Sequence, residues 1–395
     1  MTNRIKILII RLSAIGDVIH CLPVLHALRR KFPNAYIGWV VEDKAADILI
    51  NNPLLDKVYV LPKKKWKDQG LTINTIREFI DFVKLIREEN FDIAIDLQEL
   101  FKSGLMTFLS GAKRRIGHAK TREFADIFVN EKLKPHNIFD PDKMIIERYL
   151  EPAQYLGAPI DEVKFSLPPI NQETKDYIDS FLKNFKEDRP LVVFSPATIW
   201  PSKHWIEAYW SALLEKLSLS YNVVLVGSKE DTNLVNRIIL PLRSRSEGAC
   251  DEQDPQLVSE RSGSDEPPLR EQGRLKLVPT KSHNYLSLAG KTTLFQLIEL
   301  FNRSDILVAP DTGPAHIANA TDKPVIITIF GSTSYKRSAP WGKQHAALSA
   351  ELPCQPCFKR QCRRKDFKME CMQKITPDTI IKKINEKLTT KLEKC

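Results

Sequence analysis

The strongest constraint on the fold is the regular alternation of short apolar runs with segments of helical spacing. In the first half of the chain, residues 17–32 and 76–88 have helical spacing, and a third helix is predicted over 144–156, with a kink at Pro152. Strand-like runs separate these segments at residues 5–10, 35–41, 58–61 and 93–97. Because strands that alternate with helices form parallel sheets with both faces covered, this half predicts an α/β domain.

The pattern stops at Gly157 and resumes beyond Pro168-Pro169. The second half has strand-like runs at 191–194, 222–226, 306–309 and 324–330, with helical patterns at 205–217 and 293–301. We therefore predict two doubly wound, Rossmann-like α/β domains that face each other across a cleft. They span residues 1–165 and 166–375, and a basic C-terminal helix follows over 376–395. In such sheets, ligands bind beyond the carboxyl ends of the strands.

Residues 241–281 interrupt the second block. The segment is rich in Arg, Ser, Glu, Asp and Pro, and its charges are nearly balanced, with seven bases and eight acids. So few apolar residues bury too little surface to offset the entropy of ordering. We predict a disordered insertion in the second domain, for which a tolerated surface insertion is the simpler interpretation and a docking role the alternative.

The formal net charge is +10, and most of it lies near the C-terminus. Residues 354–395 hold twelve Lys or Arg against five Asp or Glu, and Lys63, Lys64, Lys65 and Lys67 form a second cluster. A basic surface fits a nucleic acid, plain solvation or an anionic lipid surface. No helix-turn-helix, zinc-finger or RNA-binding consensus accompanies the charge, which disfavours nucleic acid. The apolar runs are too short for a signal peptide or a membrane span, so we expect a soluble, cytoplasmic protein.

The first motif, Ser13 to His20, directly follows the first strand. It lacks the spaced glycines of a dinucleotide fingerprint and the Gly-Lys-Ser/Thr of a Walker loop. Gly16 permits close approach of another group, and Asp17 opens the helix. Asp17 is either a helix cap, worth about 1 kcal/mol, or a general base at the mouth of the cleft.

The second motif, Ala309 to His316, follows a strand of the second half. Thr312 and Gly313 lead into a helix with Pro314 in its first turn. Backbone amides and the helix dipole would then point at an anion such as a phosphate. A packed His316 in a capped strand–helix junction is the alternative, but the density of Asp, Thr, Gly and His favours a nucleotide diphosphate site.

Two further segments lie after strands of the second half. In Ser195 to Trp205, Lys203 could neutralise a leaving phosphate, or could simply be a surface lysine. In Gly227 to Asp231, the carboxylates could bind ribose hydroxyls or cap a helix.

Four cysteines in the basic C-terminal region have the spacing Cys354-x2-Cys357-x4-Cys362-x8-Cys371. The set could ligate a structural zinc ion, although only the first pair has the usual spacing of zinc ligands. Reduced thiols fit the sequence equally well, and disulfides are disfavoured in the cytosol.

Taken together, these segments resemble the ADP-heptose:lipopolysaccharide heptosyltransferases, which are glycosyltransferases of the GT-B type. The similarity covers nearly the whole chain except 241–281, and the first half is most similar to the heptosyltransferase I group. The matching segments are Gly16 to Pro23, Trp39 to Glu42, Asp96-Leu97-Gln98 with Lys102-Ser103, Thr121-Arg122-Glu123, Lys203-His204-Trp205, Leu288 to Thr292, and Asp311-Thr312-Gly313 with His316. Glu99 departs from the family, in which Gly commonly follows Asp-x-Gln.

The resemblance implies a role for each matching residue. Asp17 corresponds to the catalytic base and Lys203 to the lysine beside the donor phosphates, which also assists catalysis. The donor-binding residues implied are Thr198, Lys203, Glu230, Asp311, Thr312, Gly313 and His316. The acceptor-binding residues implied are Gly16, His20, Lys63, Lys64, Lys65 and Arg122.

The resemblance also implies the reaction, which is the inverting transfer of heptose from ADP-heptose to the Kdo region of the lipopolysaccharide inner core. The chemistry would need no cofactor, with a structural zinc ion or stimulation by a divalent cation left open. The acceptor would be a phosphorylated lipid A–Kdo at the cytoplasmic face of the inner membrane, and we expect a monomer without a nucleic-acid partner. The alternatives are transfer from another nucleotide sugar and a non-enzymatic protein that binds nucleic acid or a membrane surface.

Overall fold

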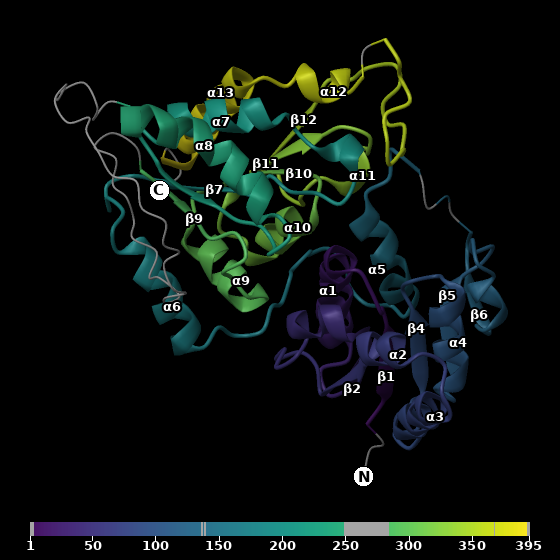
Figure 1. Cartoon of the computed structure of the whole chain (residues 1–395). Helices are drawn as coiled ribbons and strands as arrows, with labels where there is room; N and C mark the ends of the chain where they lie inside the picture. The colour runs from purple at the N-terminus through teal and green to yellow at the C-terminus, as the bar shows by residue number, and fades with distance from the viewer. Residues whose placement is uncertain (1–3, 136, 138–139, 249–283, 367, 393–395) are drawn as a thin grey trace, which may run out of the picture.

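The computed structural model describes residues 4–135, 137, 140–248, 284–366 and 368–392. It contains two six-stranded sheets in which every paired strand is parallel to its neighbour (Figure 1). The first sheet has the order β3-β2-β1-β4-β5-β6. Its strands are β1 (Lys6–Ile10), β2 (Tyr36–Glu42), β3 (Lys57–Leu61), β4 (Ile93–Asp96), β5 (Arg114–His118) and β6 (Glu131–Leu133).

Helices cover both faces of the first sheet, which explains why its central strands are apolar throughout. On one face lie α1 (Ile15–Lys31) and α5 (Ile145–Tyr155), which pack against each other. On the other face lie α2 (Lys63–Gln69), α3 (Ile73–Arg87) and α4 (Phe101–Leu109). Two 3₁₀ helices, η1 (Asp43–Ile48) and η2 (Ala125–Ile127), follow β2 and β5.

The second sheet has the order β12-β11-β10-β7-β8-β9, which repeats the doubly wound order of the first sheet. Its strands are β7 (Leu191–Phe194), β8 (Asn222–Leu225), β9 (Tyr285–Ser287), β10 (Ile306–Pro310), β11 (Val325–Phe330) and β12 (Ala346–Ser349). The surrounding helices are α6 (Gln172–Leu182), η3 (Pro201–Lys203), α7 (Glu207–Leu217), α8 (Thr232–Gly248), α9 (Leu294–Arg303), α10 (Gly313–Thr321), α11 (Tyr335–Ser338), α12 (Glu370–Gln373) and α13 (Pro377–Leu392). The predicted fold class, two doubly wound α/β domains, is confirmed.

One boundary predicted from the sequence is wrong. Residues 241–248, assigned to a disordered insertion, continue α8 as a regular helix. The reason is Leu242, which is buried in the same apolar cluster as Val235 and Ile238 of α8 and Leu213 of α7. This burial extends the helix into a charged stretch that local composition alone would leave disordered. Residues 249–281 of the predicted insertion lie outside the described residues.

The expected C-terminal helix corresponds to α13, and it packs on the second domain. Ile380 and Ile384 are buried in the apolar cluster that also contains Trp210 of α7 and Ile327 of β11. Among the helices of the described residues, none is long and apolar enough to cross a membrane.

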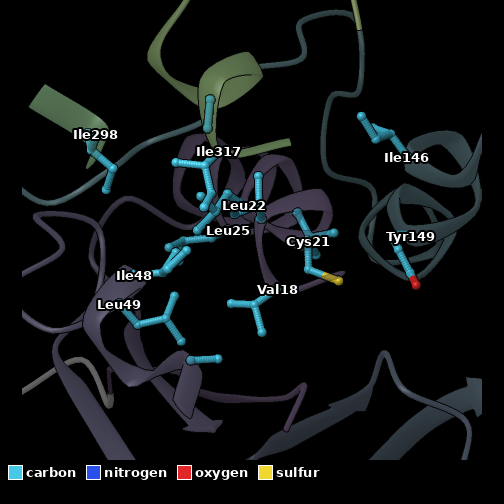
Figure 2. Packing of buried hydrophobic residues seen from close by; sticks show 14 of the residues in the cluster. Val18, Cys21, Leu22, Leu25, Ile48, Leu49, Ile146, Tyr149, Ile298 and Ile317 are labelled. Carbon is cyan, nitrogen blue, oxygen red and sulfur yellow. The ribbon is translucent and has the colours of Figure 1, made fainter. Parts of the chain in front are cut away.

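Helix α1 joins the two domains. Its residues from Val18 to Leu25 are buried on every side, so the helix has no solvated face over this stretch. Leu22 and Leu25 of α1 belong to one apolar cluster with Ile317 of α10 and Ile298 of α9 (Figure 2). Because this cluster runs from the first sheet to the second, the two domains share a core.

The shared core predicts a large effect of truncation within α1. We expect Leu25→Ala to lower the free energy of unfolding by about 2–5 kcal/mol. The side chain is fully buried, so its removal leaves a cavity that neither solvent nor a movement of surface residues can fill. The measurement is urea unfolding followed by tryptophan fluorescence. Leu219→Ala, at a side chain that is 50% exposed, is the matched control and should change stability by less than about 0.5 kcal/mol. Equal effects of the two substitutions would contradict a shared core at Leu25.

Candidate active site

The two domains meet at the loops that follow β1 and β10, the first at the switch point of its sheet. The beginning of α1 lies against the beginning of α10. A Cβ atom at Gly16 would lie 3.1 Å from Cδ2 of His316 and 3.8 Å from Cα of Gly313. A glycine at position 16 is therefore what permits this close approach of the two helices.

Asp17 lies at this junction and is held from three sides. Its Oδ2 is 2.9 Å from Nη2 of Arg11 and accepts a hydrogen bond of 3.3 Å from the backbone N–H of Ala14. The hydroxyl of Tyr149 donates to Oδ1 at 3.4 Å. Asp17 thus helps to cap α1, which was one of the two roles predicted from the sequence. Its side chain is nevertheless 43% exposed, so a ligand can still reach the carboxylate.

The charge of Asp17 is set by Arg11. Burial by itself raises the pKa of Asp17, but the positive charge of Arg11, together with His20 and the backbone N–H of Ala14, outweighs it, and the pKa lies below its usual value. Arg11 is fixed in turn, since its Nη1 donates to the carbonyl of Leu97 at 2.7 Å and its carbonyl accepts from Nε1 of Trp39 at 3.1 Å. Asp17 is consequently an anchored carboxylate that is ionised at neutral pH.

A second ion pair lies at the carboxyl edge of the other sheet. Nζ of Lys203 is 2.7 Å from Oδ2 of Asp311, which also accepts from the hydroxyl of Thr333 at 2.7 Å. Burial raises the pKa of Asp311, but a hydrogen bond from His316 and the charge of Lys203 outweigh it and hold the pKa far below normal. Nζ also donates to the backbone carbonyl of Asp311 at 3.2 Å, so Asp311 positions Lys203 through two hydrogen bonds and leaves the third hydrogen of the ammonium group for a ligand.

Two histidines connect this ion pair to the first domain. Nε2 of His20 lies 3.0 Å from Nδ1 of His316, and Nε2 of His316 lies 3.5 Å from Oδ1 of Asp311. If His316 is neutral and points its N–H at Asp311, its Nδ1 is an acceptor and His20 must donate. Burial is the main cause that lowers the pKa of His20 well below its usual value, which agrees with a neutral His20.

The beginning of α10 offers room for an anion. Thr312 occupies the N-cap position, and its side chain does not cap the helix but donates to the carbonyl of Pro310 at 3.3 Å. A Cβ atom at Gly313 would meet no described atom within 4 Å. An open helix N-terminus beside Lys203 is suited to a phosphate group.

The other predicted donor residues, Thr198 and Glu230, lie in the loops after β7 and β8. The carbonyl of Thr198 is 2.8 Å from Nε2 of His204, so this loop is held by its backbone. Glu230 is exposed in the loop after β8, and its pKa is lowered by hydrogen bonds from its own backbone N–H and from Ser228. Asp231 closes the turn that precedes α8, because its carboxylate accepts from the backbone N–H of Ser228 at 2.8 Å.

The predicted acceptor residues separate into different surroundings. Lys63 pairs with Glu42 at 2.8 Å, whereas Lys65 pairs with Glu78 at 2.7 Å. Lys64 is exposed, and Arg122 contacts Glu123 at 3.3 Å. These basic side chains do not form one cluster.

Lys102 is a functional candidate that the predicted acceptor set leaves out. Its Nζ is 2.5 Å from the second oxygen of Glu42 and 3.4 Å from Oγ of Ser13. Glu42 is buried and therefore holds both Lys63 and Lys102 beside the loop that carries Asp17. The Lys102-Ser103 match to the family was the only sequence signal for this position.

Glu99 departs from the family for a visible reason. Its φ is +59°, in the left-handed region where glycine is favoured. Its carboxylate is buried and pairs with Arg148 at 2.5 Å and with Nδ1 of His118 at 2.9 Å. These charges hold Glu99 in a conformation that otherwise suits glycine.

The four C-terminal cysteines lie between β12 and α13. Burial and the neighbouring thiols of Cys362, Cys354 and Cys357 raise the pKa of Cys371 to about 11. Within the described part of the chain, no three His, Cys, Asp or Glu side chains are arranged to hold a metal ion. The structural zinc ion stays a prediction from the spacing alone.

With this geometry established, comparison with known proteins gives the class. The model of glycosyltransferase family 9 (heptosyltransferase) matches residues 79–246 and 263–368. The chain belongs to this family, and it is a glycosyltransferase.

Among curated proteins, it is similar to lipopolysaccharide heptosyltransferase 1 of Pseudomonas aeruginosa, with 25% identity over 359 residues, 90% of this chain and 87% of the relative. The lipopolysaccharide heptosyltransferase 1 of Campylobacter coli is 29% identical over 344 residues, 85% of this chain and 86% of the relative. The protein of the same name from Escherichia coli K12 is 28% identical over 352 residues, 87% of this chain and 93% of the relative.

Solved structures agree on the fold. A glycosyl transferase of family 9 from Veillonella parvula superimposes with a TM-score of 0.74 at 18% identity, covering 99% of both chains. An Escherichia coli heptosyltransferase solved with ADP gives a TM-score of 0.67 at 22% identity, covering 97% of this chain and 100% of the other. These neighbours place the chain in the GT-B fold.

The Arg11–Asp17 pair makes a pH prediction. Replacing Arg11 with Met removes the charge that lowers the pKa of Asp17, so this pKa should rise, and burial should carry it above the usual value of about 3.9. In the wild type, the ion pair contributes to stability above about pH 4, and this contribution is lost as the pH falls through the lowered pKa. The measurement is a ¹³C NMR titration of the Asp17 carboxyl group.

The control for that titration is Arg30→Met, which removes an exposed arginine that pairs with Asp161 at 2.7 Å. It should leave the titration of Asp17 unchanged. An unaltered pKa of Asp17 in Arg11→Met would mean that Arg11 does not set its charge.

Proposed function

We propose that this chain is an inverting heptosyltransferase that transfers heptose from ADP-heptose to the Kdo region of the lipopolysaccharide inner core, with Asp17 as general base. The observation that carries the proposal is the contact between the loops after β1 and β10. It brings an accessible, ionised carboxylate and a lysine beside an open helix N-terminus to one junction between the domains. Relatives named as lipopolysaccharide heptosyltransferases support the substrate class.

The donor side follows from the charge on ADP. Lys203 and the backbone amides at Thr312 and Gly313 would bind the diphosphate and stabilise the negative charge that it gains as the glycosidic bond breaks. Asp311 would keep Lys203 oriented without taking part in the bond changes. Glu230, after the neighbouring strand β8, would bind the ribose hydroxyls, and Thr198 would contact the donor from the loop before η3. A solved heptosyltransferase that carries ADP supports this class of donor.

On the acceptor side, the proposed base has a lowered pKa. The acceptor hydroxyl attacks the anomeric carbon, the bond to the diphosphate oxygen breaks, and the hydroxyl proton passes to Asp17. A carboxylate with a lowered pKa is a weak base toward a free hydroxyl. The hydroxyl becomes acidic only as its oxygen bonds to the anomeric carbon, so the proton transfers late, in an oxocarbenium-like transition state. A single displacement of this kind inverts the anomeric configuration.

Basic side chains would bind the phosphorylated sugar-lipid acceptor. Glu42 holds Lys63 and Lys102 together, and Lys102 contacts Ser13 in the loop that precedes Asp17. Lys64, Lys65 and Arg122 would extend this surface. Gly16 and His20 would line the junction itself, so that an acceptor sugar reaches Asp17 between the domains. The chemistry itself would need no metal ion, and we propose that the enzyme acts at the cytoplasmic face of the inner membrane.

The proposal predicts that Asp17→Asn removes the base and keeps the donor site. Transfer to a Kdo-containing acceptor should fall about 10²–10⁴-fold in kcat, as followed by ADP release. The affinity for ADP, measured by calorimetry, should be nearly unchanged because the diphosphate contacts lie on the other domain.

Tyr149→Phe is the matched control, since it removes only the 3.4 Å hydrogen bond to the same carboxylate. It should cost less than about tenfold in kcat. Near-normal turnover in Asp17→Asn would refute Asp17 as the base.

A further inference from the structure

Exposed apolar side chains gather on one layer of the first domain. Leu71 is 89% exposed, Ile73 85% and Phe124 71%. The other large apolar side chains exposed in this layer are Ile76, Ile80, Leu85, Phe101, Phe108 and Ile127. All belong to α3, α4, η2 or the loops that precede them. Exposed apolar patches on a protein surface mark interaction sites.

Helix α3 is apolar on two sides. Thr75, Val83 and Ile86 face the sheet and are buried. Ile73, Ile76 and Ile80 are spaced by three and four residues, so they form an outward stripe of their own. This outward stripe contributes nothing to the core and is exposed to a partner.

The charges beside this stripe are positive. Arg77 and Lys84 follow Ile73 and Ile80 by four residues and so lie on the same side of α3. Lys64 and Lys67 of α2 are exposed, and within the described residues neither ammonium group, nor the guanidinium of Arg77, makes an ion pair. Glu78 is turned away toward α2, where it binds Lys65 and Nε1 of Trp66. Lys84 pairs with Asp81 at 3.4 Å, so in the described part of the chain the unneutralised positive charge beside the stripe comes from Arg77, Lys64 and Lys67.

The position of this surface matters as much as its composition. Helix α3 connects β3 to β4, two parallel strands, so its first turn lies at the carboxyl edge of the sheet. Leu71 and Ile73 are in or beside this first turn, while Phe101 follows β4 and Phe124 follows β5 at the same edge. The edge also carries Asp17 and the Glu42–Lys63–Lys102 cluster. The exposed apolar side chains consequently flank the acceptor side of the proposed active site.

We propose that the α3 face, formed by Leu71, Ile73, Ile76, Ile80, Lys67 and Arg77, docks on the surface of an anionic lipid bilayer. The inference rests on the proposed function, in which the acceptor is lipid-linked. Apolar side chains on a basic helix insert at the boundary between headgroups and acyl chains, and the positive charges are attracted by anionic lipids. A polyanion such as nucleic acid would complement the charges but not the isoleucines. Docking on this face brings the carboxyl edge of the first sheet to the membrane, where a lipid-anchored sugar can reach Asp17.

The test uses the full chain and two kinds of vesicle, phosphatidylcholine alone and phosphatidylcholine with 30% phosphatidylglycerol. In a sedimentation assay, the wild type should bind the anionic vesicles and should bind the neutral ones at least about tenfold more weakly. Leu71→Ser/Ile73→Ser should weaken binding to the anionic vesicles at least about tenfold. Lys67→Glu/Arg77→Glu should have a comparable effect that shrinks at high salt.

The matched control is Ile199→Ser/Leu219→Ser, which removes two exposed apolar side chains of the second domain, 89% and 50% exposed. It should bind vesicles like the wild type. Absence of wild-type binding, or equal loss in the control, would overturn the docking surface. A concentration-dependent dimer that Leu71→Ser/Ile73→Ser abolishes would also overturn it, because the face would then bind a second copy.

Failure of the docking surface can be separated from failure of the proposed function. With a water-soluble Kdo acceptor, Leu71→Ser/Ile73→Ser should transfer heptose like the wild type, while transfer to an acceptor embedded in vesicles should fall. Vesicle binding without any transfer would refute the heptosyltransferase but not the docking surface. If Leu71→Ser/Ile73→Ser transferred heptose as fast as the wild type to both the soluble and the embedded acceptor, the docking surface alone would be refuted.

Discussion

The structure depends on the packing of α1 against α10. Leu22 and Leu25 of one helix share an apolar cluster with Ile317 of the other, and this cluster joins the cores of both domains. At the N-terminal ends of the same two helices, a Cβ atom at Gly16 would lie only 3.1 Å from Cδ2 of His316, so glycine fits here without displacing the histidine. Each helix begins a few residues after a strand, and the short loop between them carries polar residues of the candidate site. The contact between the two helices therefore decides which side chains of the two domains meet.

Two ion pairs at this junction have opposite consequences. Asp311 is buried, and its charge is consumed by Lys203, Thr333 and His316. Asp17 is paired with a buried arginine but keeps a large exposed fraction. The first carboxylate is suited to orienting a lysine, and the second to meeting a ligand. His20 and His316 lie between these ion pairs, and His20 is neutral. The buried junction therefore avoids two adjacent positive charges.

The central strands and the motif positions could be predicted from the sequence, because a strand buried on both faces is a continuous apolar run. Strands β5, β6, β9 and β12 could not, since they lie at or near the sheet edges and contain residues such as Arg114-Arg115 and Glu131-Lys132. The motif loops follow the carboxyl ends of parallel strands, so their position at one edge of each sheet could be predicted. The partners of their side chains were not. Arg11, Tyr149 and Lys102 act through contacts between residues far apart in the sequence, which no local pattern encodes. The prediction of disorder from residue 241 onward failed for the same reason, because the burial of Leu242 depends on α7.

The most direct test of the central claim, a single displacement assisted by Asp17, is the stereochemistry of the product. The measurement is ¹H NMR of the glycosidic linkage formed by the wild-type protein from ADP-heptose and a Kdo-containing acceptor. A linkage whose anomeric configuration is opposite to that of the donor is the predicted result. A product with the donor's configuration would require a second displacement and would contradict the account, as would the absence of any transfer from ADP-heptose.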